Sequence, residues 1–261
     1  MMIVDDVALL HRLADAAGTA IRPYFRADFG LEAKADASPV TLADRAAETA
    51  IRDILESERP ADGIIGEEFG TVREGAARQW VIDPIDGTTS FVAGRPIFGT
   101  LIALMKDGWP LLGLIDQAIS GERWVGAVGK PTTFNGAPVK TRRCAALSDA
   151  ILATTSPNCF SEHQAEHFMA LAKKTAHRRL IWGGDCYNYA LLANGYIDIV
   201  VEAGLKLHDF AALIPIVEGA GGMMCDWNGD PLSANSDGNV IALGDPARLE
   251  DVLEGLGCHH E

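Results

Sequence analysis

The order of elements along the chain predicts an α+β lobe followed by an α/β lobe. Patterns typical of amphipathic helices come first, a run of strand patterns follows, and strands then alternate with helices. We place the N-terminal lobe at residues 1–143 and the C-terminal lobe at residues 144–261. The chain has 261 residues, of which 48% are hydrophobic, so it can bury one large core or two closely packed ones.

Two amphipathic helices are predicted near the N-terminus. Apolar residues recur at three- and four-residue spacing over residues 4–25, and similar spacing relates Ala47, Ile51 and Ile54. The segment from Thr41 to Asp44 fits a capping box that begins the second helix.

Short apolar runs predict the strands of the first lobe. They span residues 63–66, 79–82, 97–106, 111–117 and 123–128, with turns at Asp107-Gly108 and Asn135-Gly136. In the second lobe we expect strands at residues 151–155, 197–201 and 240–243, and helices at residues 163–175, 187–194, 209–218 and 246–256. Pro215 falls inside one of these helices and predicts an irregularity or kink there.

The charge balance excludes some classes of partner. A net charge of −14 argues against a nucleic-acid or anionic-membrane surface, but not against an anionic substrate, because bound divalent metals would invert the local field. The most apolar stretch, residues 98–115, is interrupted by Lys106, Asp107 and Gly108, so we expect no transmembrane span. The N-terminus lacks the pattern of a signal peptide, which indicates a cytoplasmic protein.

The five cysteines are scattered and show no paired metal spacing. Reduced thiols in a cytoplasmic protein are the favoured interpretation. The terminal Cys258-His259-His260 could touch a metal, but we interpret it as a frayed end.

The segment Trp80 to Ser90, WVIDPIDGTTS, is the most informative part of the chain. An apolar triplet predicts a buried strand that ends in an acidic turn carrying Asp83 and Asp86, and a helix is expected to begin after Gly87. Carboxylate oxygens suit Mg²⁺, and a helix N-terminus suits a phosphate. The pattern therefore indicates a metal-dependent phosphatase; an ordinary Asp-Pro-Asp-Gly turn is the alternative.

The six residues from Asp83 to Thr88 resemble the signature of the inositol monophosphatase family, Asp-Pro-(Ile/Leu)-Asp-Gly-Thr. The resemblance covers nearly the whole chain, most clearly from Lys34 through Gly222. It implies a layered αβαβα sandwich, a homodimer and a small phosphorylated metabolite as substrate.

The same resemblance implies a set of metal ligands. Glu67, the first glutamate of Gly-Glu-Glu, would join Asp83, Asp86, Asp209 and the Ile85 carbonyl in holding two or three Mg²⁺ ions. A solvated acidic pair is the alternative for Glu67, and a helix cap is the alternative for Asp209. His208 stands where the family has tryptophan, which leaves the local packing in doubt.

Further site residues are implied for water and phosphate. Thr88 and Asp44 would orient the attacking water, with Asp44 or Glu67 taking its proton, and Gly87, Thr88 and Lys34 would lie near the phosphate. Helix capping explains Asp44 equally well without the resemblance, and a loop lysine such as Lys34 is unremarkable alone.

The substrate prediction depends on Asp185 and Glu202. Asp185 occupies a position where the family usually has a small residue, and the segments 184–187, 204–210 and 215–222 resemble the branch that hydrolyses histidinol phosphate in histidine biosynthesis. Both carboxylates could pair with the ammonium and imidazole groups of that substrate. A helix N-cap is the alternative for Asp185. Inositol phosphate or a nucleotide-derived phosphate is the rival substrate, and a non-catalytic binding protein is the rival class.

Overall fold

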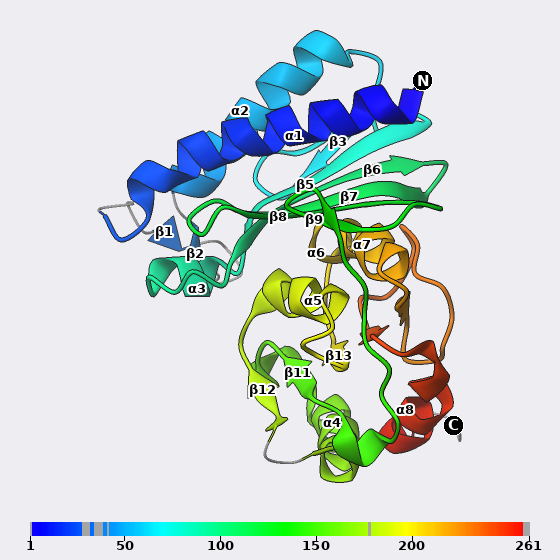
Figure 1. Cartoon of the computed structure of the whole chain (residues 1–261). Coiled ribbons are helices and arrows are strands. Elements are labelled where there is room, and N and C mark those ends of the chain that lie inside the picture. Colours follow the sequence, from blue (N-terminus) through cyan, green and yellow to red (C-terminus); the bar gives the residue numbers. More distant parts are fainter. Residues whose placement is uncertain (1, 28–31, 34–38, 41, 177–178, 258–261) are drawn as a thin grey trace.

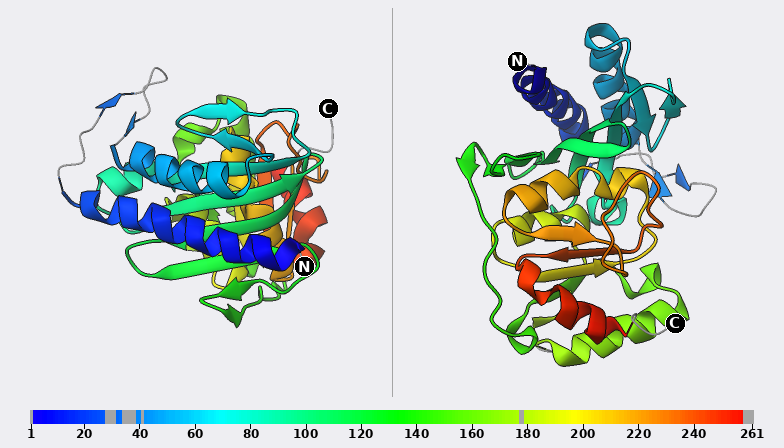
Figure 2. Two further views of the ribbon diagram at one scale, coloured as in Figure 1. Left: turned by 90° about the horizontal axis from the view of Figure 1, so that it is seen from above. Right: turned by 90° about the vertical axis from the view of Figure 1, so that its right-hand side faces the viewer.

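A computed structural model describes residues 2–27, 32–33, 39–40, 42–176 and 179–257 of the chain. Helices and sheets stack in five alternating layers, as Figures 1 and 2 show. This layering confirms the predicted αβαβα sandwich.

Two sheets form the β layers. The large sheet has the strand order β10-β9-β8-β7-β6-β5-β3-β4, in which β3 and β5 run parallel and the other neighbours are antiparallel. Its strands are β3 (Gly63–Gly66), β4 (Gly70–Val72), β5 (Arg78–Asp86), β6 (Gly99–Lys106), β7 (Trp109–Gln117), β8 (Glu122–Ala127), β9 (Thr133–Phe134) and β10 (Ala137–Pro138). The small sheet, in the order β12-β11-β13-β15-β14, contains β11 (Leu152–Thr154), β12 (Ile181–Trp182), β13 (Ile199–Glu202), β14 (Met223–Cys225) and β15 (Val240–Leu243). A separate antiparallel pair consists of β1 (Glu32–Ala33) and β2 (Pro39–Val40).

The helices fill the other three layers. They are α1 (Met2–Ile21), α2 (Leu42–Glu58), α3 (Thr88–Val92), α4 (Glu162–Lys174), α5 (Asp185–Ala193), α6 (Leu207–Phe210), α7 (Leu213–Gly219) and α8 (Leu249–Leu256), with short 3₁₀ turns at Arg22–Tyr24, Leu147–Asp149, Pro157–Cys159 and Pro246–Arg248. None of the helices in the described ranges is long and apolar enough to cross a membrane.

Alternation of side chains along the strands divides the core into three parts. One face of the large sheet, with Trp80 and Ile82, packs under α1 and α2. Its other face, with Val81, joins α5, α6, α7 and one face of the small sheet in a central core. The remaining face of the small sheet packs on α4 and α8. The middle helices therefore contact both sheets, which brings their residues to the end of β5.

The large sheet lies very close to α7. A Cβ atom on Gly126 of β8 would come within 2.3 Å of the Pro215 carbonyl oxygen, and one on Gly113 of β7 within 1.9 Å of the Ala212 carbonyl oxygen. A side chain at either position would push the helix off the sheet.

Most predicted elements are present, and the differences have physical reasons. The predicted helix at 209–218 is two helices, α6 and α7, separated at Ala211-Ala212. Pro215 lies in the first turn of α7, where its missing N–H has no partner to lose, so it does not kink that helix. The helix predicted from residue 187 begins at Asp185, and β9 and β10 flank the predicted hairpin turn at Asn135-Gly136. No strand was predicted at β1, β2, β4, β12 or β14.

The chain passes from the large sheet to the small one between Pro138 and Leu152. The division into lobes at residues 143 and 144 stays a prediction. The predicted capping box cannot be followed, because Thr41 lies outside the described residues.

Candidate active site

The two aspartates of the DPIDGT segment lie on one strand, not in a turn. The apolar triplet before Asp83 predicted a strand that ends there, but β5 continues to Asp86 and pairs with β6 at both aspartates. Between them two residues of β5 stand opposite one residue of β6, which is a β-bulge. In an unbroken strand, residues three apart would point to opposite faces. The extra residue brings both carboxylates to the same side.

Three hydrogen bonds hold this bulge. The Ile85 N–H donates to Asp83 Oδ1 at 3.0 Å, and the Thr100 hydroxyl donates to the Pro84 carbonyl oxygen at 2.8 Å. The Thr88 hydroxyl donates to the Ile85 carbonyl oxygen at 3.1 Å. Pro84 has no N–H to give to the ladder, which favours the irregularity at this point.

Two other elements complete an acidic cleft of about 340 Å³. Asp209 comes from α6, and one oxygen from each of Asp83, Asp86 and Asp209 lies within 4.8 Å of the other two. Glu67 directly follows β3, the parallel neighbour of β5, and lines the same cleft as Asp86 and Asp209. Asp209 Oδ2 also accepts the Lys206 backbone N–H at 2.6 Å, so Asp209 belongs to the cluster and stabilises the start of α6.

The cluster is electrostatically unfavourable without a cation. Burial raises the pKa of Asp83 well above its usual range, and the charges of Glu67, Asp86, Asp209 and Asp44 raise it further. Burial likewise raises the pKa of Asp86, followed by the charges of Asp185 and Asp209. Because the atoms that would ligate a metal are carboxylate oxygens, this group of aspartates could hold a hard divalent ion.

The adjacent glutamates Glu67 and Glu68 have different surroundings. Glu68 has a side chain only 3% exposed and faces Arg45, with 3.9 Å between its Oε2 and the Arg45 Nε. Glu48, fully buried on α2, accepts the backbone N–H of Glu68 at 2.7 Å and that of Phe69 at 3.2 Å. Glu48 was not predicted, although a carboxylate on the apolar face of a predicted helix was a signal that could have indicated it.

Asp185 lies against the loop that follows Asp86. Gly87 has a φ of +87°, and a Cβ atom there would come within 2.8 Å of Asp185 Oδ2. Asp86 Oδ2 accepts the Cys186 backbone N–H at 2.6 Å, and Asp185 Oδ2 accepts the Ser90 hydroxyl at 3.2 Å. The start of α5 is thereby joined to the start of α3.

Asp185 itself has an unusual backbone. Its φ is +45°, and the N-cap of α5 is Gly184, so Asp185 is the first helical residue and not the cap considered from the sequence. Its N–H donates to Thr155 Oγ1 at 3.1 Å. Burial raises the pKa of its carboxyl to about 6, although the Ser90 hydroxyl and the charge of Arg95 oppose the rise.

Glu202 ends β13 and lines the same cleft. One carboxylate oxygen accepts the Thr155 N–H at 2.9 Å and the other accepts the Tyr189 hydroxyl at 2.9 Å. Burial raises the pKa of Glu202 to about 7 despite these hydrogen bonds. Thr155 and Tyr189 were not predicted, because only the fold brings them to the cleft. Ser90 ends the WVIDPIDGTTS segment, but its sequence position did not indicate a contact with Asp185.

Two predicted residues, Asp44 and Lys34, have not yet been placed. Asp44 is fully buried in the first turn of α2, close enough to Asp83 to influence its pKa. Its pairing with Thr88 stays a prediction, since the Thr88 hydroxyl donates to Ile85 in this structure. Lys34 lies outside the described residues.

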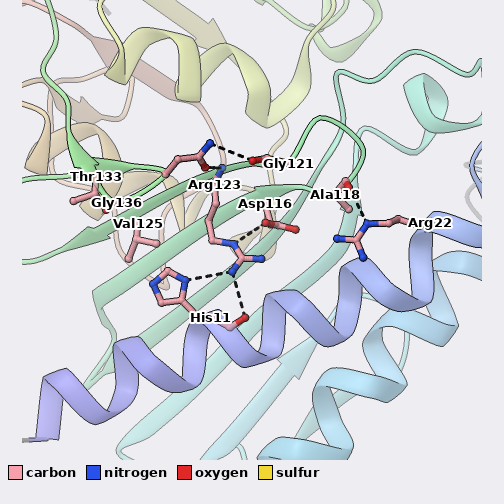
Figure 3. Close-up of a pocket in the computed structure, with 10 residues that line it drawn as sticks. His11, Arg22, Asp116, Ala118, Gly121, Arg123, Val125, Thr133 and Gly136 are labelled. Atoms are coloured by element: carbon pink, nitrogen blue, oxygen red, sulfur yellow. Dashed lines mark hydrogen bonds and ion pairs between the residues drawn. The ribbon is translucent and has the colours of Figure 1, made fainter.

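A second cavity of about 340 Å³ lies elsewhere, between α1 and strands β7 to β9 (Figure 3). Arg123 occupies its centre and donates to Asp116 Oδ1 at 2.7 Å. Arg123 also donates to Asp15 Oδ1 at 2.8 Å. The His11 ring also approaches Arg123, and burial lowers the pKa of that histidine. These contacts attach α1 to the large sheet.

The sequence matches the model of the inositol monophosphatase family over residues 4–258. The chain belongs to this family. It is 47% identical to "Bifunctional phosphatase IMPL2, chloroplastic" of Arabidopsis thaliana, over 97% of this chain and 75% of that protein. It is 39% identical to a "Histidinol-phosphatase" of Streptomyces coelicolor, over 97% of this chain and 96% of that one.

Solved structures agree with the family assignment. A structure of an inositol monophosphatase from Zymomonas mobilis is 55% identical, has a TM-score of 0.91, and covers 98% of this chain and 99% of its own. The three relatives are thus named as a bifunctional phosphatase, a histidinol-phosphatase and an inositol monophosphatase.

Proposed function

We propose that this protein is a Mg²⁺-dependent phosphomonoesterase that hydrolyses L-histidinol phosphate to L-histidinol and phosphate. The observation that carries the proposal is the presence of Asp185 and Glu202 in the same cleft as Asp86 and Asp209. Two carboxylates beyond the metal cluster favour a substrate that carries cationic or hydrogen-bond-donating groups beside its phosphate. Histidinol phosphate offers an ammonium and an imidazole.

The proposed metal ligands are Glu67, Asp83, Asp86, Asp209 and the Ile85 carbonyl, which would hold two or three Mg²⁺ ions. When bound, Mg²⁺ neutralises phosphate oxygens and lowers the pKa of a coordinated water.

The chain's own groups would position the reacting molecules. The Thr88 hydroxyl donates a hydrogen bond to the Ile85 carbonyl oxygen, so the lone pairs of Thr88 Oγ1 would accept a hydrogen bond from the attacking water. Asp44 or Glu67 would take the proton of that water. Gly87 and Thr88, with Lys34, would contact the phosphate, and water would attack phosphorus in line with the leaving alkoxide.

Inositol monophosphate is the second candidate substrate, favoured by the name of the Zymomonas mobilis structure at 55% identity. An inositol ring presents only hydroxyl groups, so it would gain less from Asp185. A non-catalytic binding protein of the same fold is the third possibility, and phosphate release with Mg²⁺ distinguishes it from both.

The test is the effect of Asp185→Asn on substrate choice. Asparagine tolerates the left-handed φ of +45°, so the change removes charge with little backbone strain. A hydrogen bond to a charged group contributes about 1.5–3 kcal/mol, which corresponds to about tenfold or more in kcat/KM for histidinol phosphate. A phosphate ester without a cationic group should be hydrolysed almost as before.

The matched control is Asp107→Asn, an exposed aspartate with a φ of +50° in the turn after β6. It should leave both substrates unaffected. An equal loss on both substrates with Asp185→Asn would make Asp185 a structural residue, and no loss on either would remove it from substrate recognition.

A further inference from the structure

The second cavity, between α1 and strands β7 to β9, has the same volume as the acidic cleft, about 340 Å³. A cavity of this size suits a small molecule. Charged side chains of both signs line it, together with a histidine ring: Arg22, Arg123, Asp116 and His11 (Figure 3). None of these residues belongs to the proposed phosphatase machinery.

Asp116 has one carboxylate oxygen with a partner and one without. Its side chain is 5% exposed, and Oδ1 accepts the Arg123 Nε–H at 2.7 Å. Oδ2 is closed off from solvent and receives no hydrogen bond from any residue that the structure describes. A buried carboxylate oxygen without a donor costs free energy, so a donor supplied by a bound molecule would be stabilising.

Arg22 is the complementary case, a guanidinium without a carboxylate. Its side chain is exposed, and its Nε–H donates to the Ala118 carbonyl oxygen at 3.0 Å (Figure 3). Within the described ranges Arg22 has no ion-pair partner. The N–H groups of its Nη atoms can therefore bind a carboxylate. The charge of Arg22 lowers the pKa of Asp116, so the two groups are close together.

The charges around the cavity balance. Arg22 and Arg123 are positive. Asp116 and Asp15, which both accept hydrogen bonds from Arg123, are negative. Burial lowers the pKa of His11 below 6.5, so its ring is neutral at pH 7. A balanced site with an open acceptor and an unpaired guanidinium complements a zwitterion better than a simple anion or cation.

We propose that this cavity binds a free α-amino acid, with its carboxylate on Arg22 and its ammonium on Asp116 Oδ2. The ammonium supplies the donor that Oδ2 lacks, and the carboxylate supplies the charge that Arg22 lacks. The bound molecule links the residue that follows α1 to β7 of the large sheet. This site is independent of the proposed phosphatase function, because neither residue lines the acidic cleft.

The experiment identifies the ligand and then locates it. Saturation-transfer NMR in saturating Mg²⁺ shows which of the standard L-amino acids bind the wild-type protein, and titration calorimetry gives the Kd. The test variants are Arg22→Gln and Asp116→Asn. The matched control is Arg26→Gln, because Arg26 is also exposed and donates its Nε–H to a carbonyl oxygen, that of Gly94, at 3.0 Å, but does not line the cavity.

We expect a Kd at least about tenfold weaker in Arg22→Gln and in Asp116→Asn, as for the loss of one charge-assisted contact, and an unchanged Kd in Arg26→Gln. Circular dichroism checks that Asp116→Asn is folded, and the exposed Arg22 keeps the test decisive if it is not. The N-acetyl derivative of the bound amino acid, which lacks the ammonium, should also bind at least about tenfold more weakly.

No binding by any of the amino acids, or an unchanged Kd in Arg22→Gln, would overturn the proposal. A Kd that weakens in Asp185→Asn but not in Arg22→Gln would place the amino acid in the acidic cleft, which would overturn it as well. Equally tight binding of the N-acetyl derivative would overturn the role of Asp116.

Discussion

Glu202 illustrates how a single buried side chain can make stability depend on pH. It is 4% exposed, and burial raises its pKa from 4.5 to about 7. Between pH 4.5 and about pH 7, Glu202 therefore keeps its proton in the folded protein but loses it in the unfolded chain. The stabilising contribution is therefore complete below pH 4.5 and is lost as pH rises through about 7.

We predict that Glu202→Gln, which keeps the shape without the charge, removes this dependence. Raising the pH from 5 to 8 should lower the free energy of unfolding of the wild type by up to about 3 kcal/mol more than that of the variant. Urea unfolding in EDTA measures both. Parallel pH curves for the two proteins would show that Glu202 is charged in the fold at pH 5.

Thr88 offers a second test at the residue scale. Thr88→Ala should lower kcat by about 10²–10⁴-fold, the usual range for positioned acid–base groups, while Mg²⁺ binding is retained. Thr88→Ser keeps the hydroxyl and serves as the control, with much of the rate preserved. Equal rates in Thr88→Ala and wild type would exclude Thr88 from water orientation.

At the scale of elements, the central motif could be located from the sequence but its conformation could not. Six residues identified Asp83 and Asp86, and their local spacing suggested a turn. Whether a strand ends or bulges depends on its register with β6, which is a long-range property. For the same reason Thr100, which bonds the bulge from β6, could not be predicted. The two helices that replace the predicted single one contact different strands: α6 contacts β5 and β6, and α7 contacts β7 and β8.

The attachment of α1 gives a prediction at this scale. Arg123→Met leaves Asp116, whose side chain is 5% exposed, without its ion-pair partner. Loss of one partner of a buried pair is strongly destabilising, and we expect about 2–3 kcal/mol in the free energy of unfolding. Arg12→Met, which breaks an exposed pair with Glu58 on α2, should cost about 1 kcal/mol or less. Similar losses in the two variants would contradict a special role for the Arg123 network.

At the scale of the whole molecule, the layers bring together carboxylates from distant segments. The order of helices and strands along the sequence predicted an α+β lobe followed by an α/β lobe. The family resemblance predicted how helices and sheets stack in layers. Asp209 and Glu67 were predicted through that resemblance, because spacing alone cannot place β3, β5 and α6 at one cleft. Glu48 and Thr155 carried no such motif and became visible only in the assembled fold.

We expect the assembled cluster to make stability depend on metal, because it could hold a metal ion. Mg²⁺ at 100 times its Kd should stabilise the folded protein by about 2.7 kcal/mol, which raises Tm by several degrees for a chain of this size. Asp86→Asn should raise the Tm of the metal-free protein, by removing repulsion, and should weaken the response to Mg²⁺. Differential scanning fluorimetry with a Mg²⁺ titration measures both. An identical Mg²⁺ response in wild type and variant would exclude Asp86 as a ligand.

The most direct test is phosphate release by the wild-type protein from L-histidinol phosphate and from inositol monophosphate, each with Mg²⁺ and with EDTA. We predict release that requires Mg²⁺ and a kcat/KM at least about tenfold higher for histidinol phosphate, as expected for one charge-assisted contact. A higher kcat/KM for inositol monophosphate would contradict the proposed substrate, and Mg²⁺-independent release or none from either ester would contradict the metal-dependent phosphatase itself.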